Sequence, residues 1–247
     1  MSKVPELTLL FWILKIAATT LGETGGDAVS MSMNLGYLTA TAIFATIFVA
    51  AVAAQIAAKR FDPWLYWTTI VATTTVGTTL ADFTDRSLGI GYAGGTTLLL
   101  SLLLASIAVW YWTLGTVAVD SISSPKAEIF YWVTIMFSQT LGTALGDWTA
   151  DSAGLGYLGS AAVFFALLGL VVAAYFFTRI SRVVLFWAAF VLTRPLGAVI
   201  GDFLDKPVAS GGLALSRYAA SGVLLAFMAA SLVLVPQRPA RVSHESG

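Results

Sequence analysis

The chain carries one motif four times, and this internal repeat constrains its fold more than any other feature. Each copy starts with an aromatic residue followed by tryptophan. A glycine stands ten residues after each tryptophan, and an aspartate stands fifteen residues after it. Agreement in all four copies is hard to obtain by chance, so we infer a fourfold repeat. The tryptophans are Trp12, Trp67, Trp132 and Trp187, the glycines are Gly22, Gly77, Gly142 and Gly197, and the aspartates are Asp27, Asp82, Asp147 and Asp202.

The spacing of the repeats divides the chain into two halves. Trp12 and Trp132 are 120 residues apart, and so are Trp67 and Trp187. A longer polar connection, Asp120 to Glu128, separates the second repeat from the third. We therefore expect an N-terminal half with repeats 1 and 2 (residues 1–120) and a C-terminal half with repeats 3 and 4 (121–236). Residues 237–247 are expected to form a disordered cytoplasmic tail.

The composition is that of a membrane protein. The chain is 58% hydrophobic and 11% charged, whereas soluble domains carry roughly 25% charged residues. Each repeat holds two apolar segments of roughly 20 residues, enough for a helix to cross a ~30 Å hydrocarbon core. The predicted fold is an all-α integral membrane protein with eight transmembrane helices, built from four two-helix repeats with pseudo-fourfold symmetry. The expected spans are residues 7–30, 36–58, 64–85, 92–118, 127–150, 157–178, 183–205 and 213–235.

Lysine and arginine positions predict the orientation of these helices. Eight of them fall on the side of the two termini, and three fall on the opposite side, which favours cytoplasmic termini. Because each repeat has an even number of spans, all four repeats point the same way and are parallel rather than inverted. The three on the opposite side are Arg86, Lys206 and Arg217.

Polar residues form a stripe on the first helix of each repeat. Positions 8, 11, 15 and 18 after each tryptophan lie on one helix face and carry most of the acidic residues. These carboxylates are the candidate metal ligands: Glu23, Asp27, Asp82, Asp85, Asp147, Asp202 and Asp205. The supporting residues are Thr20, Thr75, Thr78, Thr140 and Thr143, together with Asp151, which lies one residue out of register.

Deep carboxylates need compensation, since each costs ~2.5–3.5 kcal/mol inside a membrane span. Protons, basic partners, a cation or a water-filled cavity could each offset this cost. Lys15 and Arg194 lie deep in the spans and are the predicted charge partners, although they cannot serve every carboxylate. Two structural alternatives stay open for the repeated aspartates: they cap helix ends, or they are protonated and hydrogen-bond neighbouring helices.

Two other recurring features have structural interpretations. The repeated glycines, four residues from a second small residue, predict close packing of the first helices around a pseudo-symmetry axis. The aromatic–tryptophan pairs predict an interfacial aromatic belt at the cytoplasmic side.

The acidic stripe predicts a transporter or pathway for a hard cation. Carboxylate and hydroxyl oxygens suit Mg²⁺, Mn²⁺, Ca²⁺, Na⁺ or H⁺, and we place a divalent ion, Mn²⁺ or Mg²⁺, first. The chain has no cysteine and a single histidine, His244 in the tail, which argues against copper and zinc. The alternatives are a proton- or Na⁺-linked transporter and a non-transporting membrane scaffold or sensor with structural aspartates.

Other classes of function and partner find little support in the sequence. No residues before the repeated aspartates match the Gly-x-Gly-Asp motif of intramembrane aspartyl proteases, and no Ser/His pair suggests another hydrolase, so we expect no enzyme. The formal net charge is zero, so we expect no nucleic-acid partner. The expected partners are membrane lipid and an inorganic cation, and no cofactor is expected beyond a possible bound divalent ion.

One resemblance supports this picture. The repeated LGxxxGD after a tryptophan, with GY ahead of the next span, resembles a family of bacterial inner-membrane proteins described as uncharacterised repeat membrane proteins. It covers about residues 7 to 235. The resemblance implies a multi-pass protein of the bacterial inner membrane, and it implies no functional residues.

Overall fold

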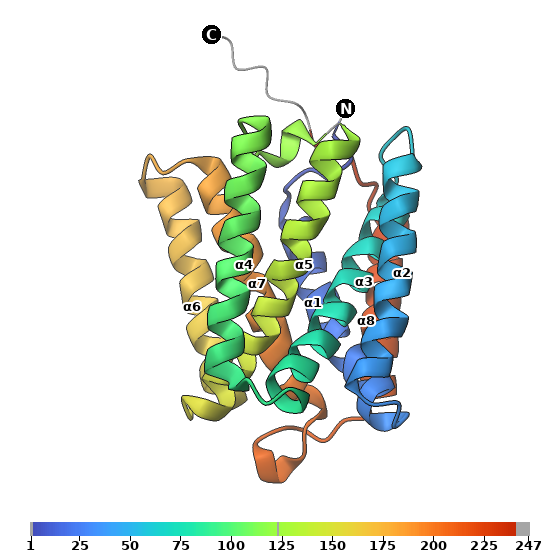
Figure 1. Cartoon of the computed structure of the whole chain (residues 1–247), viewed down its shortest axis with the longest axis vertical. Coiled ribbons are helices and arrows are strands. Elements are labelled where there is room, and N and C mark those ends of the chain that lie inside the picture. Colours follow the sequence, from blue (N-terminus) through green and yellow to red (C-terminus); the bar gives the residue numbers. More distant parts are fainter. Residues whose placement is uncertain (1, 123, 241–247) are drawn as a thin grey trace.

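A computed structural model describes residues 2–122 and 124–240, and this part of the chain forms eight long α-helices and no strand (Figure 1). They agree closely with the predicted segments. Helix α4 ends earlier than expected because Gly115 adopts a left-handed φ of 75° and caps it. The helices are α1 (Leu9–Asp27), α2 (Tyr37–Ala57), α3 (Pro63–Asp82), α4 (Gly91–Leu114), α5 (Pro125–Asp147), α6 (Gly156–Phe177), α7 (Arg182–Asp205) and α8 (Arg217–Leu234).

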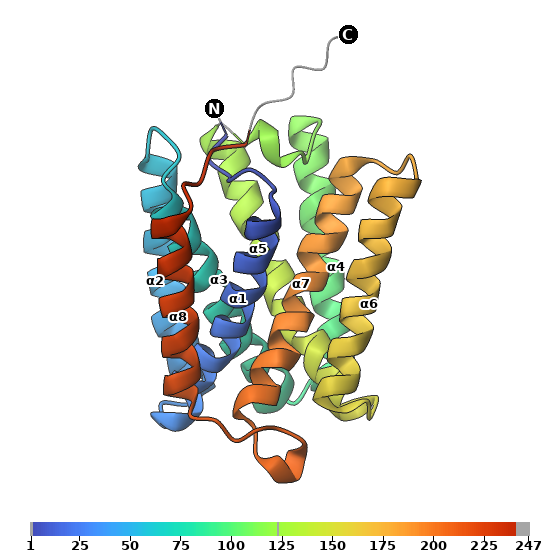
Figure 2. The same cartoon turned by 180° about the vertical axis from the view of Figure 1, so that it is seen from behind.

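The first helices of the four repeats form an inner ring. Helix α1 packs on α3, α3 on α5, α5 on α7, and α7 again on α1 (Figures 1 and 2). Each second helix lies outside this ring, against the inner helix of the next repeat: α2 on α3, α4 on α5, α6 on α7 and α8 on α1. The two halves of the chain therefore share one ring and are not separate domains, because α8 of the second half packs on α1 of the first.

The repeated glycines allow the inner helices to approach closely, as predicted. Each faces the residue seven positions after the tryptophan of the next inner helix. A Cβ atom on Gly22 would lie 2.3 Å from Thr74, and one on Gly142 would lie 2.1 Å from Arg194. The other two pairs are Gly77 with Gln139 and Gly197 with Thr19.

The aromatic pairs close the ring at the end where the chain begins and ends, which we call the terminal end. The first aromatic of each pair contacts the tryptophan of the next inner helix, and most of these rings are buried. The prediction of an interfacial aromatic belt is therefore wrong, since the rings pack on one another inside the helix ring. The centroid distances are 5.5 Å for Phe11–Trp67, 5.8 Å for Tyr66–Trp132, 6.3 Å for Tyr131–Trp187 and 6.0 Å for Phe186–Trp12.

The chain termini are tied together over the terminal end (Figure 1). Glu6 N donates to Arg238 O at 2.9 Å, and Ala240 N donates to Val4 O at 2.8 Å. Residues 237–240 thus pair with the N-terminal segment, which corrects the expectation of a disordered tail from residue 237. The rest of that tail, with His244, lies outside the described residues.

The opposite end, which we call the aspartate end, shows why the repeated aspartates are not caps. After Asp27, Asp82 and Asp147 the chain continues directly into a five-residue π-helical turn, and α7 continues as α-helix past Asp202. The first three aspartates make no side-chain capping hydrogen bond to these turns. The capping alternative is therefore wrong for them. π-helical turns recur at functional sites.

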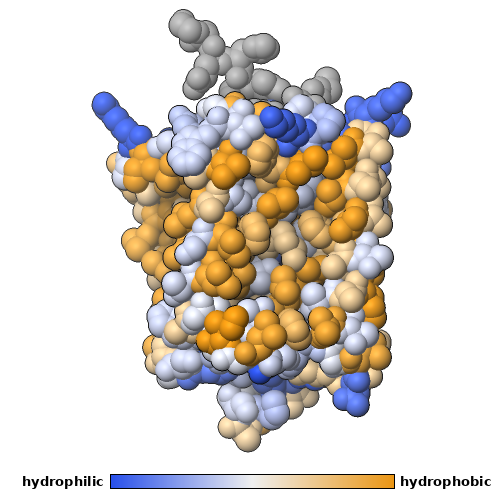
Figure 3. Space-filling model, viewed as in Figure 1, coloured by the Kyte–Doolittle hydropathy of each residue, from blue (hydrophilic) through white to orange (hydrophobic). Residues whose placement is uncertain are grey.

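The outer surface is apolar between the two ends. Five of the described helices, α2, α4, α6, α7 and α8, are long and apolar enough to cross a membrane. On the face in Figure 3, hydrophobic side chains cover the middle and charged ones lie near the ends. Helices α1, α3 and α5 are more polar, because they turn hydroxyl and acidic groups into the ring.

Candidate cation site in the inner ring

Polar side chains occupy the interior of the ring in layers that follow the repeat. Next to the aromatic layer, on its side toward the aspartate end, position 3 after each tryptophan holds Lys15 in repeat 1 and apolar residues in the other repeats. Position 7 holds Arg194 in repeat 4, where the other repeats carry Thr19, Thr74 and Gln139. The repeated aspartates follow at position 15, toward the aspartate end. Each inner helix therefore contributes one residue to every layer.

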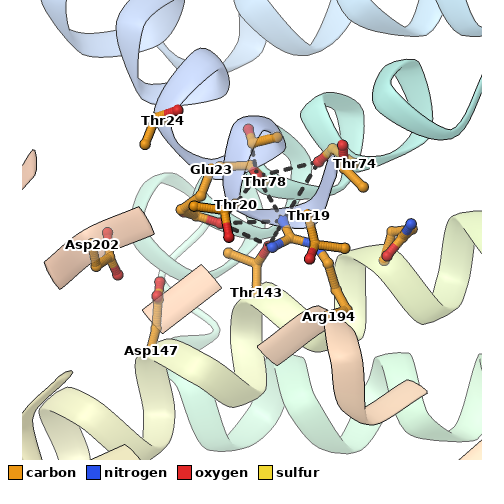
Figure 4. A network of polar contacts seen from close by, with 12 residues as sticks. Thr19, Thr20, Glu23, Thr24, Thr74, Thr78, Thr143, Asp147, Arg194 and Asp202 are labelled. Atoms are coloured by element: carbon orange, nitrogen blue, oxygen red, sulfur yellow. Dashed lines mark hydrogen bonds and ion pairs between the residues drawn. The ribbon is translucent and has the colours of Figure 1, made fainter. Parts of the chain in front are cut away.

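Arg194 ties the inner helices together. It is fully buried, and its guanidinium donates to Glu23 Oε2 at 3.1 Å and to Thr78 Oγ1 at 2.7 Å. A further hydrogen bond runs to Thr143 Oγ1. One side chain of α7 thus contacts α1, α3 and α5 (Figure 4). The prediction that Arg194 pairs with a carboxylate is confirmed, and the carboxylate is that of Glu23.

Lys15 is also expected to pair with a carboxylate, but its surroundings differ from those of Arg194. It is fully buried, its Nζ lies 3.3 Å from Gln139 Oε1, and it lies 4.2 Å from the centre of the Phe190 ring. Within the described chain it forms no ion pair. Lys15 is therefore held by an amide and an aromatic face, and the expectation that it pairs with a carboxylate is wrong.

Six buried carboxylates and three basic residues lie at the aspartate end, and we call this group the acidic layer. All six acidic residues are at most 7% exposed. In the part of the chain that the structure describes, their ion-pair partners come from the connections at this end and from the start of α8. The carboxylates are those of Asp27, Asp82, Asp85, Asp147, Asp202 and Asp205, and the basic residues are Arg86, Lys206 and Arg217.

Arg86 organises one half of the acidic layer. Its guanidinium lies 3.1 Å from an oxygen of Asp82, in its own repeat, and 3.1 Å from an oxygen of Asp147, in the next. It also donates to the Tyr37 hydroxyl at 3.2 Å. Asp85 belongs to this half, but both of its buried oxygens have no hydrogen-bond partner within the described residues.

Lys206 and Arg217 organise the other half. Lys206 Nζ lies 3.0 Å from Asp202 Oδ1, in its own repeat, and contacts Asp27 Oδ2, in the next. Arg217 pairs with Asp205 at 2.9 Å and approaches Asp27 at 3.7 Å. Burial lowers the pKa of Lys206, but the carboxylates of Asp202, Asp27 and Asp205 outweigh it and hold that pKa above its ordinary value. Lys206 is thus charged in this arrangement.

This second half also has the geometry of a metal site. Asp27, Asp202 and Asp205 each offer one carboxylate oxygen, and these three atoms lie within 4.8 Å of one another. Among the described residues, Oδ1 of Asp27 and Oδ1 of Asp205 are buried without a hydrogen-bond partner. Oxygen ligands of this kind suit hard cations such as Mg²⁺, Ca²⁺ and Mn²⁺.

The predicted supporting residues divide into three groups. Thr78 and Thr143 bind Arg194. Asp151 is exposed and accepts a hydrogen bond from Tyr92 at 3.3 Å. The hydroxyls of the remaining three, Thr20, Thr75 and Thr140, donate to carbonyls of their own helices and not to carboxylates of the acidic layer.

Arg86, Lys206 and Arg217 are the site residues that the sequence reasoning missed. Counting charges for orientation placed them only on the side opposite the termini, although Arg86 and Lys206 each stand four residues after a repeated aspartate. On a helix this spacing brings the two side chains together. For Arg217 there is no such local signal, since its contacts to Asp27 and Asp205 depend on the packing of α8.

Comparison with known proteins agrees with the four repeats and their boundaries. No curated protein and no solved structure matches the chain. Four segments match the family described as Repeat of Unknown Function (DUF347), at residues 10–61, 65–116, 130–181 and 185–235. Each begins two residues before the tryptophan of its repeat. Because these matches cover most of the chain, the protein belongs to the family of Repeat of Unknown Function (DUF347) proteins.

Proposed function

We propose that this protein is a multi-pass membrane protein that transports a hard cation, or provides a pathway for it, through the acidic layer. A divalent ion, Mn²⁺ or Mg²⁺, is the first candidate. The bacterial inner membrane, with both termini in the cytoplasm, is the proposed location. The apolar outer helices support a membrane setting, and the lysines and arginines near the terminal end support the orientation.

The observation that carries the proposal is the charge imbalance of the acidic layer. Among the described residues, five buried carboxylates pair with three basic side chains, and a sixth, that of Asp85, is buried against Gly95 without a hydrogen-bond partner. Glu23 does not change this balance, because Arg194 already pairs with it. Charges that are buried without partners are costly, so the remaining carboxylates must bind protons or cations. A cation site is where such an excess is useful.

The layers suggest how the ring would act. The acidic layer lies at one end, while Arg194 and the aromatic rings fill the axis toward the terminal end. A cation would thus enter and leave from the aspartate end in this conformation. Passage to the other side would require the contacts of Arg194 with Glu23, Thr78 and Thr143 to open. Transport would then proceed by alternation between two states, each open at only one end of the ring, and not through a continuous pore.

The test is metal uptake in cells or proteoliposomes with Asp27, Asp82, Asp147 and Asp202 changed singly to Asn. Asn keeps the size of the side chain and removes the charge. We expect uptake of Mn²⁺ or Mg²⁺ to fall at least tenfold in one or more variants, since a lost ligand charge costs on the order of 1.4 kcal/mol or more. Asp151→Asn, on the exposed surface at the same end, is the matched control. Unchanged uptake in all four variants would refute the proposal.

A second candidate function is a membrane scaffold or sensor with structural aspartates. It is favoured by the ion pairs, since all four repeated aspartates contact a basic side chain. A scaffold needs no saturable cation binding. Measurement of Mn²⁺ binding to the purified protein in lipid nanodiscs therefore separates the two. A proton- or Na⁺-linked transporter would instead show uptake driven by an H⁺ or Na⁺ gradient without bound divalent metal.

A further inference from the structure

Arg86 and Lys206 occupy equivalent places in the two halves of the acidic layer. Each stands nineteen residues after the tryptophan of its repeat and four residues after a repeated aspartate. Each joins the aspartate of its own repeat to that of the next one. The two positions therefore share a geometry and differ in side-chain chemistry.

Arg86 is held firmly. Besides its contacts with Asp82 and Asp147, it donates to the Tyr37 hydroxyl and lies 5.9 Å from the centre of the Tyr92 ring. Its partners come from four different helices. A planar guanidinium with oriented N–H groups suits such a fixed, multidentate arrangement.

Lys206 is held by carboxylates, to one of which it donates a hydrogen bond. Among the described residues, its side chain pairs with the carboxylates of Asp27 and Asp202. An ammonium group is a compact point charge on a flexible stem, so it can leave one place and be hydrated in another. The backbone at Lys206 is fixed independently, because Ala214 N donates to its carbonyl at 2.9 Å. The side chain can therefore move without unfolding the connection between α7 and α8.

Lys206 also lies within the three-carboxylate group that suits a cation. Its Nζ contacts two of the three aspartates whose oxygens lie within 4.8 Å of one another. A second observation points to a ligand there: Oδ1 of Asp27 and Oδ1 of Asp205 are buried with no hydrogen-bond partner among the described residues. Lys206 leaves these two acceptors unused.

We infer that Lys206 is a tethered cation that occupies the substrate position among Asp27, Asp202 and Asp205, and that a divalent cation binds there by displacing its ammonium group. The inference rests on the proposed function. With Lys206 and Arg217 in place, the three carboxylates keep one uncompensated negative charge. Exchange of the ammonium for a divalent ion neutralises the group, whereas exchange for a monovalent ion does not. In the other half of the acidic layer, Arg86 stays bound to Asp82 and Asp147, and that half does not exchange its cation.

The experiment measures Mn²⁺ binding to the full chain in lipid nanodiscs, by the electron paramagnetic resonance signal of free Mn²⁺. Lys206→Gln removes the competitor, and Arg86→Gln removes the equivalent charge from the other half. We expect Lys206→Gln to bind Mn²⁺ about tenfold tighter or more, because a unit charge beside the site no longer competes. Arg86→Gln should tighten binding by no more than about threefold, since it acts only through longer-range attraction.

The outcomes separate the inference from the proposed function. Saturable binding that Lys206→Gln leaves unchanged or weakens, or that both variants tighten equally, overturns the role of Lys206 alone. No saturable binding in the wild type and in Lys206→Gln overturns the divalent-cation proposal as well.

A second measurement uses the wild-type chain and so does not depend on the folding of a variant. Lysines are acetylated with an N-hydroxysuccinimide ester, and the rate at each site is followed by mass spectrometry. We expect saturating Mn²⁺ to speed the labelling of Lys206 severalfold. Lys59 and Lys126, exposed at the terminal end, are the internal references. Labelling of Lys206 that Mn²⁺ leaves unchanged or slows relative to these references overturns the inference.

Discussion

The two halves of the acidic layer are built on the same repeat, but they neutralise their aspartates differently. In the half of Arg86, one guanidinium joins Asp82 to Asp147, and Asp85 has no partner among the described residues. In the half of Lys206, a second cation, Arg217, is added from α8. The first half has one guanidinium that is also bound by a tyrosine hydroxyl, and the second has an ammonium and a guanidinium among three carboxylates. Duplicated positions can thus keep their geometry while their chemistry diverges.

The largest expected effect on stability concerns Arg194, which connects the N-terminal and C-terminal halves of the chain through Glu23 and Thr78. Arg194→Met leaves Glu23 buried without its partner, and breaking such a pair costs about 3–5 kcal/mol. We expect the apparent melting temperature of the purified protein in detergent to fall sharply. The double variant Arg194→Met, Glu23→Gln should recover much of this loss, since no lone charge is left. If the single variant melts at the same temperature as the wild type, the Arg194–Glu23 pair does not hold the two halves of the chain together.

The next effect compares the two bridging cations directly. Arg86→Lys replaces a fork that serves Asp82, Asp147 and Tyr37 by a single ammonium, so it should cost about 1–2 kcal/mol of stability. Lys206→Arg, the reverse exchange, should cost less than about 1 kcal/mol. Thermal unfolding monitored by tryptophan fluorescence gives both values. Equal losses would show that the two halves hold their aspartates alike.

The smallest effect concerns the aspartates that differ most in their partners. Asp205→Asn removes the partner of Arg217 and should cost about 1 kcal/mol. Asp85→Asn should be neutral or slightly stabilising, because Asn places no charge at a buried position without a basic contact. The same unfolding measurement applies. A loss for Asp85→Asn as large as that for Asp205→Asn would mean that Asp85 has a partner of equal value.

Much of the fold follows from local patterns in the sequence. Apolar runs, with start signals such as Ser124–Pro125 and Asp62–Pro63, place the helices within a few residues. The repeated glycines predict the close contacts between inner helices. The burial of the aromatic pairs could not be foreseen, because an amphipathic ring at a helix end suits a membrane interface and a core equally well.

The candidate site follows from the sequence only in part. The acidic residues are visible because carboxylates inside apolar helices are rare and recur here at one offset. Their partners are harder to see. Arg86 and Lys206 lie after the spans, and only the return of these side chains toward the ring shows that they serve Asp147 and Asp27 of the next repeats.

The sequence by itself determined the fourfold repeat, the helices and the excess of carboxylates, since periodicity and charge are properties of the chain alone. Only the tertiary structure decided which residues meet: that each second helix packs on the next repeat, that Arg194 fills the axis, and that Lys206 lies among three aspartates. The physical reason is the separation along the chain of the residues that interact. Helix formation depends on neighbours within a few turns, whereas the pairing of charges depends on closure of the ring, which brings residues 179 positions apart into contact.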